Sequence, residues 1–295
     1  MTGPGHRPLT LRDGRVLDAR DTGPQGALVL VPHHATPGTG TPSAEIATTV
    51  AERGARLVTW SRPGHATSPR YPGPSVAGVA GDAVEVLGAF GVDTTVTAGA
   101  SGGGPHALAC GPLRPDRSRA VAPIAGVAAH IESLGTLDWN AGMGMGNVAD
   151  FGAAARGESA SREFLAAYGQ ELATIGPEQI LSELDTLLPD VDRRYVTAAC
   201  GESLATSFCE AVGHGIDGVV DDDLAVTQPG GVDVGALEVP VHPWQGSADL
   251  MVAFAPGPWL AAVPGGRAHP PDGEGHLSIG VGHAGEIDDL VRAET

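Results

Sequence analysis

Short apolar segments alternate with longer helical segments between residues 27 and 124, and this alternation limits the folds that the chain can adopt. The segment ALVLVPHH, residues 27–34, is apolar along almost its whole length, which is typical of a parallel strand buried on both faces. The pattern further predicts a hairpin turning at Asp13-Gly14, helix Ala44–Arg53, strand Arg56–Trp60, helix Val76–Phe90, strand Thr94–Ala98, a helix ending near Cys110 and strand 119–126. We therefore predict an α/β fold with a mostly parallel central sheet flanked by helices.

The pattern changes between residues 130 and 235, where predicted helices follow one another without intervening strands. One of these helices is expected to run from Asp192 to Val212. Further elements are expected as strands at 239–246 and 267–269, as a helix near 258–263 between them and as a last helix from Leu277 onward. We interpret residues 130–235 as a helical cap inserted into a core formed by residues 1–129 and 236–295.

Composition excludes some classes of function. A chain of 295 residues with 42% hydrophobic content can bury a large core. All 17 basic residues are arginine, and 35 acidic residues leave a net charge of -18, so we expect no nucleic-acid partner. The first residues lack a signal segment, and no apolar run approaches the roughly 18 residues that span a membrane. We expect a soluble, cytoplasmic protein without a membrane partner.

The stretch Gly99-Ala100-Ser101-Gly102-Gly103 lies between a predicted strand and a predicted helix. It matches the Gly-x-Ser-x-Gly pattern, which in this context places a nucleophilic serine at a sharp turn. Gly99 and Gly103 are expected because a Cβ at either position would collide with the neighbouring backbone. The N–H of Gly102 at the helix start is a candidate oxyanion donor.

A serine needs a base, and the base needs an orienting acid; in this topology both follow the serine in the order acid, then histidine. Asp249 comes just after a predicted strand, and His276 comes just before the last predicted helix, so we predict that they act with Ser101. His283 and His269 are rival bases, but we expect the final helix to carry the first away and the short strand to contain the second. The acidic run Asp221, Asp222 and Asp223 is expected as a solvated turn or helix start.

The second oxyanion donor is expected from the loop HHATPGTG, residues 33–40. The backbone N–H of Thr36 is the first candidate and that of Ala35 the second, because Pro37 has no N–H. His33 and His34 should point to opposite faces at a strand end, and no further ligand has zinc spacing. We therefore expect no metal and no other cofactor.

Five motifs together resemble the α/β-hydrolase superfamily, in particular capped bacterial serine hydrolases of the esterase and proline-iminopeptidase-like kind. They are HHATPG, WSRPGHATS, GASGGGPHALA, WQGSADLMV and EGHLS. The resemblance covers nearly the whole chain and implies a triad of Ser101, Asp249 and His276 beneath a lid formed by the insertion. Gly102 stands where peptidase relatives often have Trp, which favours esters or other small acyl compounds.

We predict a serine hydrolase that cleaves a small ester, lactone or amide through an acyl-enzyme intermediate. An acyltransferase or cyclase would need the same triad, and an aminopeptidase-like hydrolase would need a lid carboxylate, for which Glu202 and Glu210 are the candidates. A ligand-binding protein without turnover is a remote alternative. Six residues are candidates for the substrate pocket: His34, Trp139, Met143, Met145, Phe151 and Phe208.

Overall fold

A central sheet organises the fold of the computed structural model, which describes residues 5–113, 117–127, 138–184, 187–269 and 272–293. Within these ranges the sheet has five strands in the order β3-β5-β4-β6-β7. They are β3 (Ala19–Thr22), β4 (Val29–His33), β5 (Arg56–Trp60), β6 (Thr95–Ala100) and β7 (Ser118–Ile124). Only β3 runs antiparallel to its neighbour, which confirms the predicted, mostly parallel sheet. The predicted hairpin forms separately from β1 (Leu9–Thr10) and β2 (Val16–Leu17).

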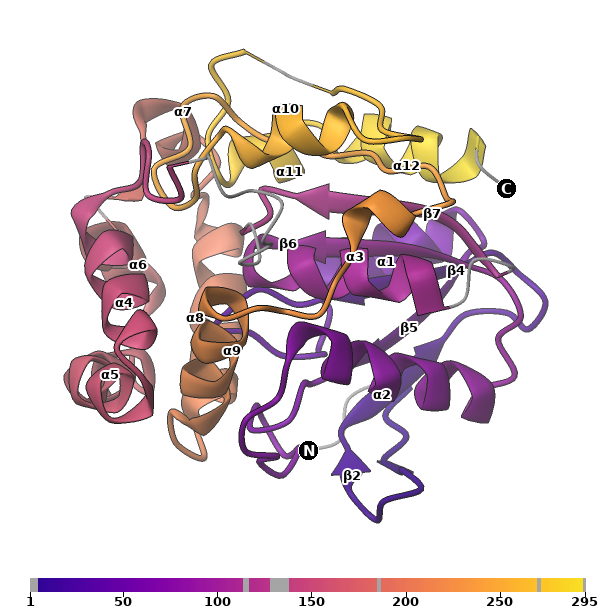
Figure 1. The fold of residues 1–295 in the computed structure, drawn as a ribbon, viewed down its shortest axis with the longest axis horizontal. Helices are drawn as coiled ribbons and strands as arrows, with labels where there is room; N and C mark the ends of the chain where they lie inside the picture. Colours follow the sequence, from indigo (N-terminus) through magenta and orange to yellow (C-terminus); the bar gives the residue numbers. More distant parts are fainter. Residues whose placement is uncertain (1–4, 114–116, 128–137, 185–186, 270–271, 294–295) are drawn as a thin grey trace.

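Helices cover both faces of this sheet (Figure 1). The helices α2 (Val76–Ala89) and α3 (Gly104–Leu113) pack side by side on the front face, and α1 (Ala44–Glu52) lies behind it. Helix α2 is capped by Ser75, whose hydroxyl accepts a hydrogen bond from the N–H of Gly78. Its buried face, at helical spacing, includes Val79, Ala83 and Val86. Burial of such faces against the strands forms the core.

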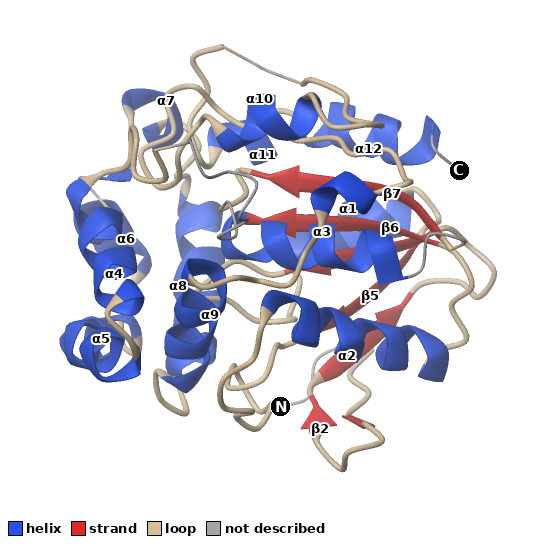
Figure 2. Ribbon diagram, viewed as in Figure 1, coloured by secondary structure: helices blue, strands red, loops and turns tan. Residues whose placement is uncertain are grey.

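Six helices of the described chain between residues 145 and 227 form a second layer beside the sheet. They are α4 (Met145–Ala155), α5 (Glu158–Leu172), α6 (Pro177–Glu183), α7 (Asp190–Arg193), α8 (Ala198–Val212) and α9 (Asp217–Thr227). The arrowheads of β6 and β7 point toward this layer, so it faces the carboxyl ends of the strands (Figure 2). Leu165, Leu172 and Ile180 belong to its own buried apolar cluster.

The predicted helix from Asp192 to Val212 is wrong, because the chain leaves the helix after Arg193 and starts a new one at Ala198. Thr197 caps this second helix, since its side chain accepts a hydrogen bond from the N–H of Cys200. The last helix is also divided, into α11 (Ser278–Val281) and α12 (Ala284–Ala293).

The expected strands at 239–246 and 267–269 are present only as isolated parallel bridges. Val241 and Trp244 each bridge to β7 on one side and to the segment 266–269 on the other. Pro240 and Pro243 cannot donate ladder hydrogen bonds, so this segment lacks a backbone donor at two positions. The chain then continues through α10 (Pro256–Ala261), close to the predicted helix at 258–263.

The proposed division into core and cap remains a prediction. Its first boundary, at residues 129–130, lies outside the described residues, and its second falls at the short 3-10 helix Val234–Ala236. Within the described chain, no helix has both the length and the apolar character that a membrane span requires.

Candidate active site

Ser101 lies at the point where β6 ends and the chain turns into α3 through the 3-10 helix η1 (Ser101–Gly103). Its φ of 50° places a residue with a side chain in the left-handed region, where backbone strain is tolerated only if the surroundings enforce it. The backbone oxygen of Ser101 accepts a hydrogen bond of 3.1 Å from the N–H of Val127, which ties the turn to the segment after β7. The strand-turn-helix context predicted for the serine is therefore present.

The glycines around the serine allow the backbones to pack closely. A Cβ on Gly99 would overlap the carbonyl oxygen of Gly103, and a Cβ on Gly103 would overlap the carbonyl oxygen of His33. Neither neighbour is a movable side chain, so a larger residue at either position would displace the turn. This confirms the steric reason predicted for both glycines.

Asp249 and His276 meet through a hydrogen bond of 2.9 Å between Oδ2 of the carboxylate and Nδ1 of the ring. Asp249 is buried, and its other oxygen accepts hydrogen bonds from the N–H groups of Met251 (2.7 Å) and Val252 (3.0 Å). With Oδ1 occupied in this way, Oδ2 is held toward the imidazole. An ionised Asp249 accepts the hydrogen bond from Nδ1, which leaves Nε2 as the basic nitrogen.

Asp192, in the short helix α7, holds the loop that carries His276. It is fully buried, and its carboxylate accepts hydrogen bonds from three successive backbone N–H groups: His276 (2.8 Å), Leu277 (3.1 Å) and Ser278 (2.9 Å). The sequence analysis did not identify this residue. The single signal available was an aspartate early in a predicted helix, which is common in solvated helix starts.

The charges of Asp249 and Asp192 act on the pKa of His276, the candidate base. Burial lowers the pKa of His276, but the charge and hydrogen bond of Asp249, together with the charge of Asp192, outweigh burial, so the pKa is raised from its ordinary value. The rival histidines have other partners: His269 lies 3.0 Å from His242, and His283 lies 3.2 Å from Glu286. Among the described residues the Ser101 hydroxyl makes no hydrogen bond, so its contact with His276 stays a prediction. Such contacts are often long in a free enzyme and tighten when substrate binds.

Thr36 and Gly102, the predicted oxyanion donors, lie against each other. A Cβ on Gly102 would be 2.5 Å from Oγ1, 2.9 Å from Cβ and 3.3 Å from the backbone nitrogen of Thr36. The absence of a side chain at Gly102 therefore brings the two backbones together beside Ser101. Two N–H groups that converge at one point can stabilise a developing negative charge.

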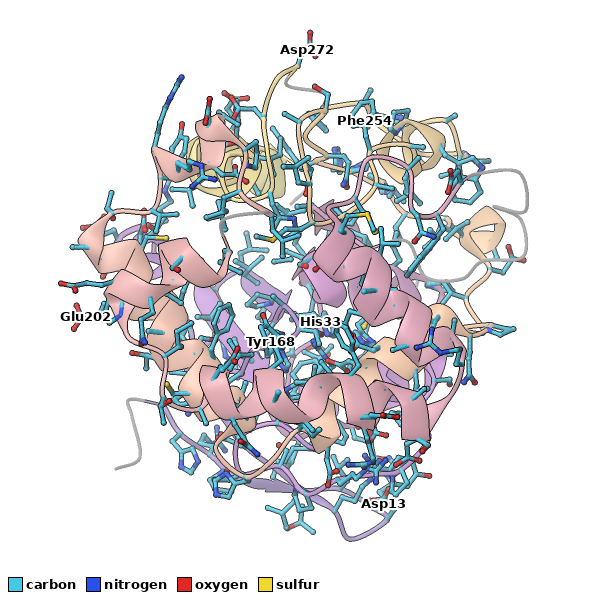
Figure 3. All side chains as sticks on the ribbon, turned by 90° about the vertical axis from the view of Figure 1, so that its left-hand side faces the viewer. Asp13, His33, Tyr168, Glu202, Phe254 and Asp272 are labelled. Atoms are coloured by element: carbon cyan, nitrogen blue, oxygen red, sulfur yellow. The ribbon has the colours of Figure 1, made fainter. Side chains whose placement is uncertain are left out.

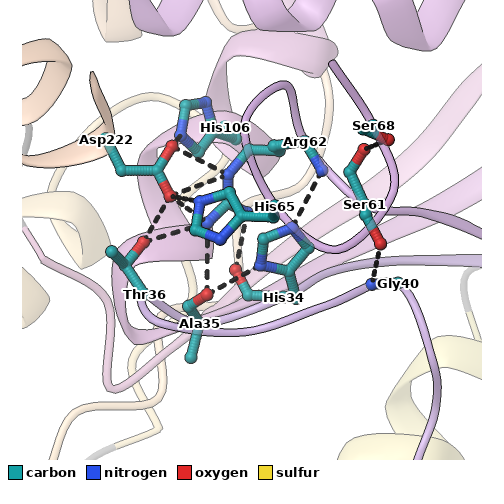
Figure 4. A network of polar contacts seen from close by, with 10 residues as sticks. All are labelled: His34, Ala35, Thr36, Gly40, Ser61, Arg62, His65, Ser68, His106 and Asp222. Carbon is teal, nitrogen blue, oxygen red and sulfur yellow. Dashed lines mark hydrogen bonds and ion pairs between the residues drawn. The ribbon is translucent and has the colours of Figure 1, made fainter. Parts of the chain in front are cut away.

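A buried guanidinium supports the loop that contains Thr36 (Figure 4). Arg62 is 1% exposed and donates to the carbonyl oxygens of His34 (2.6 Å) and Ala35 (3.2 Å) and to Oγ1 of Thr36 (2.9 Å). It also pairs with Asp222 of α9, with 2.6 Å between NH2 and Oδ2. Arg62 therefore holds the candidate oxyanion loop in place. Its counter-ion, Asp222, belongs to the helical layer and is far from the loop in the sequence.

Asp222 contradicts the expectation that residues 221–223 form a solvated turn or helix start. All three aspartates are buried within α9, with 1–4% of each residue exposed. Burial alone would raise the pKa of Asp222, but the charges of Arg62 and His65 hold it well below its ordinary value. Oδ2 also accepts a hydrogen bond of 2.6 Å from Thr36 Oγ1. Asp221 and Asp222 pair with Arg70 and Arg62, which lie far away in the chain, and the local sequence does not reveal these partners.

A cavity of about 240 Å³ opens beside Ser101 between the sheet and the helical layer. Its lining near the serine turn consists of Ser101, Gly102 and Thr36, together with Pro37, Val127 and Val252. The remaining lining residues come from α4, α5, α9 and the segment before α7: Gly146, Asn147, Asp150, Phe151, Phe164, Tyr168, Leu187, Val219, Asp222, Asp223 and Val226. In Figure 3, which looks onto this layer, Tyr168 lies near the centre of the molecule, whereas Glu202 lies at its edge.

Of the six candidate pocket residues, Phe151 lines this cavity. Trp139 and Met143 pack in the apolar cluster around Phe151, with Trp139 edge-on to its ring. Met145 is 78% exposed, and Phe208 packs within the helical layer. His34 lies in the candidate oxyanion loop, where its Nε2 accepts a hydrogen bond of 3.0 Å from the N–H of Arg62.

The cavity lining includes carboxylates that the sequence analysis did not single out as ligand-binding. Asp150 and Asp223 line it, whereas Glu202 and Glu210 do not belong to its described lining. Glu210 instead accepts a 3.4 Å hydrogen bond from Thr39 Oγ1. In the part of the chain that the structure describes, no group of three or more His, Cys, Asp or Glu residues is arranged to hold a metal ion.

Comparison with known proteins identifies the fold of this chain. No family model matches the chain, and no curated protein matches it. Among solved structures, it is similar to an enol-lactonase from Burkholderia xenovorans (TM-score 0.68, 15% identity, 98% of this chain and 99% of that one). It is also similar to a thermophilic esterase from Thermogutta terrifontis (0.68, 18%, 98% of each) and an α/β-hydrolase fold protein from Nakamurella multipartita (0.65, 18%, 98% and 100%). The chain therefore has the α/β-hydrolase fold, as the resemblance implied.

Proposed function

We propose that this chain, which has the α/β-hydrolase fold, is a serine hydrolase that transfers an acyl group from a small ester or lactone to water. The observation that carries the proposal is the 2.9 Å hydrogen bond between Asp249 and His276 in a chain whose Ser101 occupies a strained turn beside a cavity. A fold alone does not specify a function, so the proposed activity depends on Ser101, Asp249 and His276.

In the proposed mechanism, Nε2 of His276 takes the proton from the Ser101 hydroxyl as its oxygen attacks the substrate carbonyl carbon. The negative charge that develops on the carbonyl oxygen is stabilised by the backbone N–H groups of Gly102 and Thr36. Asp249 keeps the ring in the tautomer with a proton on Nδ1 and stabilises the imidazolium.

The tetrahedral intermediate then collapses, and the bond between the carbonyl carbon and the leaving oxygen breaks. His276 gives its proton to the departing alkoxide, which leaves an acyl group on Ser101. Water attacks this acyl-enzyme while His276 again accepts a proton. Release of the carboxylic acid restores the serine hydroxyl. As the acid leaves, His276 returns its proton to the Ser101 oxygen, so each proton moves among Ser101, His276, substrate and water, and the reaction needs no cofactor.

Two observations favour esters and lactones over peptides. The solved structures described above include a lactonase and an esterase of this fold. A cavity of about 240 Å³ also suits a small acyl group. Acyl transfer to a second substrate would use the same residues, and product analysis in water with added alcohols distinguishes transfer from hydrolysis.

The test of this function is labelling with a fluorophosphonate, which reacts with activated serines, followed by a panel of short-chain p-nitrophenyl esters and lactones. We expect stoichiometric labelling and turnover of the unmodified protein. Ser101→Ala should abolish both, and His276→Ala should lower kcat at least ~10³-fold with the fold retained. Turnover that survives in Ser101→Ala would overturn the proposal.

A further inference from the structure

Two carboxylates in the cavity each have a buried oxygen with no hydrogen-bond partner among the described residues. Asp150 of α4 and Asp223 of α9 both line the cavity, and these two helices pack against each other. Within the described part of the chain, Oδ1 of Asp150 and Oδ2 of Asp223 are the unsatisfied atoms. Asp223 is only 4% exposed. Buried polar atoms in proteins are almost always hydrogen-bonded, so two unsatisfied oxygens in one cavity require an explanation.

Neighbouring charges do not satisfy this pair. Asp222, the next residue along α9, already has Arg62 as its counter-ion. The described lining of the cavity contains no arginine and no histidine. Burial raises the pKa of Asp150 to about 6, while burial and then the charges of Asp150 and Asp222 raise the pKa of Asp223 well above its ordinary value. Burial and mutual repulsion thus disfavour two negative charges on this pair, and a bound cation would compensate them.

An ammonium group matches this arrangement. It carries one positive charge and three N–H donors and has no acceptor, so carboxylate oxygens are its natural partners. Phe151, Phe164 and Val226 line the same cavity and can contact the apolar carbons of a short chain. Ser101 lines the same cavity, so one bound molecule could contact both the carboxylates and the nucleophile.

We propose that Asp150 and Asp223 form a subsite for a primary ammonium group, and that the natural substrate is an amine-bearing ester or lactone. The proposal rests on the function proposed above, since it names the substrate class of the same cavity. It also replaces Glu202 and Glu210 as candidates for pairing with a substrate amine, because neither belongs to the described lining.

The first experiment compares p-nitrophenyl esters in matched pairs, in which an ammonium group at carbon 2, 3, 4, 5 or 6 of the acyl chain is replaced by methyl. For at least one pair we expect kcat/KM to favour the ammonium ester by about tenfold or more at pH 8. In the double variant Asp150→Asn/Asp223→Asn this ratio should fall to about one. The double variant should stay folded, because it loses carboxylates whose burial is not compensated by a cation. Circular dichroism and the melting temperature check its fold.

The matched control is Glu163→Gln/Glu171→Gln, which removes two carboxylates from exposed positions of α5 in the same helical layer. It should leave the ratio unchanged, which separates a local contact from the general effect of negative charge. If Ser101-dependent hydrolysis occurs but the methyl ester is preferred in every pair, the amine subsite is wrong while the proposed function stands.

A second experiment does not depend on turnover. Calorimetry of Ser101→Ala with hexylammonium and with hexanol measures binding alone. We expect the ammonium to bind about tenfold more tightly or better, and the difference to disappear when Asp150→Asn/Asp223→Asn is added. Equal affinities would overturn the subsite. Preferential ammonium binding in a protein that hydrolyses no ester would support the subsite and count against the hydrolase.

Discussion

Gly102 has no side chain at the point where the serine turn meets the candidate oxyanion loop. We predict that Gly102→Ala lowers kcat about 10²-fold or more, because its Cβ would lie 2.5–2.9 Å from the Thr36 side chain and separate the two N–H groups. Steady-state kinetics on a p-nitrophenyl ester measures this. KM should change less than kcat, since the donors act mainly on the transition state.

The control at this scale is Gly81→Ala, in the exposed face of α2, where a Cβ would meet nothing within 4 Å. This variant should keep full activity and gain up to about 1 kcal/mol in the free energy of unfolding, because alanine favours a helix. An active Gly102→Ala enzyme would argue against Gly102 as an oxyanion donor.

At the scale of elements, α7 links the helical layer to the loop of the candidate base. Asp249 first, and Asp192 after it, raise the pKa of His276, so the free enzyme should have a neutral imidazole there only at a pH above the ordinary pKa of 6.5. Activity should therefore rise with pH, and the acidic limb of the kcat/KM profile should have its midpoint above pH 6.5. We predict that Asp192→Asn moves the acidic limb of the kcat/KM profile to lower pH, because a charge that stabilises the imidazolium is lost.

Asp190→Asn serves as the control, since Asp190 lies in the same helix with a fully exposed side chain. Its profile should match that of the unmodified protein. A profile for Asp192→Asn that falls in height without moving along the pH axis would indicate that Asp192 only supports the loop and does not tune the base.

The helix α9 contributes a counter-ion to the oxyanion loop, so its stability and that of the loop are linked. We predict that Asp222→Asn lowers the free energy of unfolding by ~3–5 kcal/mol, because it leaves the Arg62 guanidinium buried without a compensating charge. Urea denaturation at pH 7.5 measures the change. Asp217→Asn in the same helix removes a carboxylate that is 41% exposed and should cost less than about 1 kcal/mol.

The pH dependence of this contribution follows from the sign of the shift. The pKa of Asp222 is depressed in the folded protein, so its contribution is present above the unfolded value of about 3.9 and is lost as pH falls through the folded value. The gap in unfolding free energy between the unmodified protein and Asp222→Asn should therefore stay constant from pH 5 to pH 8. A gap that shrinks within this range would contradict the depressed pKa.

At the scale of the whole molecule, a net charge of -18 sets the balance of long-range forces. Self-repulsion of so many carboxylates opposes the compact state, and salt screens it. We predict that raising NaCl from 10 to 200 mM increases the free energy of unfolding in urea. A decrease would mean that the arginine ion pairs at the surface outweigh the repulsion between like charges.

The sequence by itself determined the local features: the alternating strands and helices, the glycines around Ser101, and the chain order of serine, acid and base. These follow from backbone geometry and short-range periodicity, which neighbouring residues specify. Two local predictions failed: the helix expected from Asp192 breaks and restarts at Ala198 after the Thr197 cap, and the segment 239–246, which contains two prolines, pairs only through isolated bridges.

Only the tertiary structure decided which charges are buried. Asp192, Asp222 and Asp223 look like solvated helix-start residues, yet one holds the base loop, one pairs with Arg62 and one faces the cavity. An acidic side chain becomes buried when donors or cations far away in the sequence, here 84 to 160 positions, fold against it, or when a cavity leaves room for a ligand. No local pattern encodes these contacts, because the interaction energy that compensates burial of the carboxylate comes from a partner far away in the sequence.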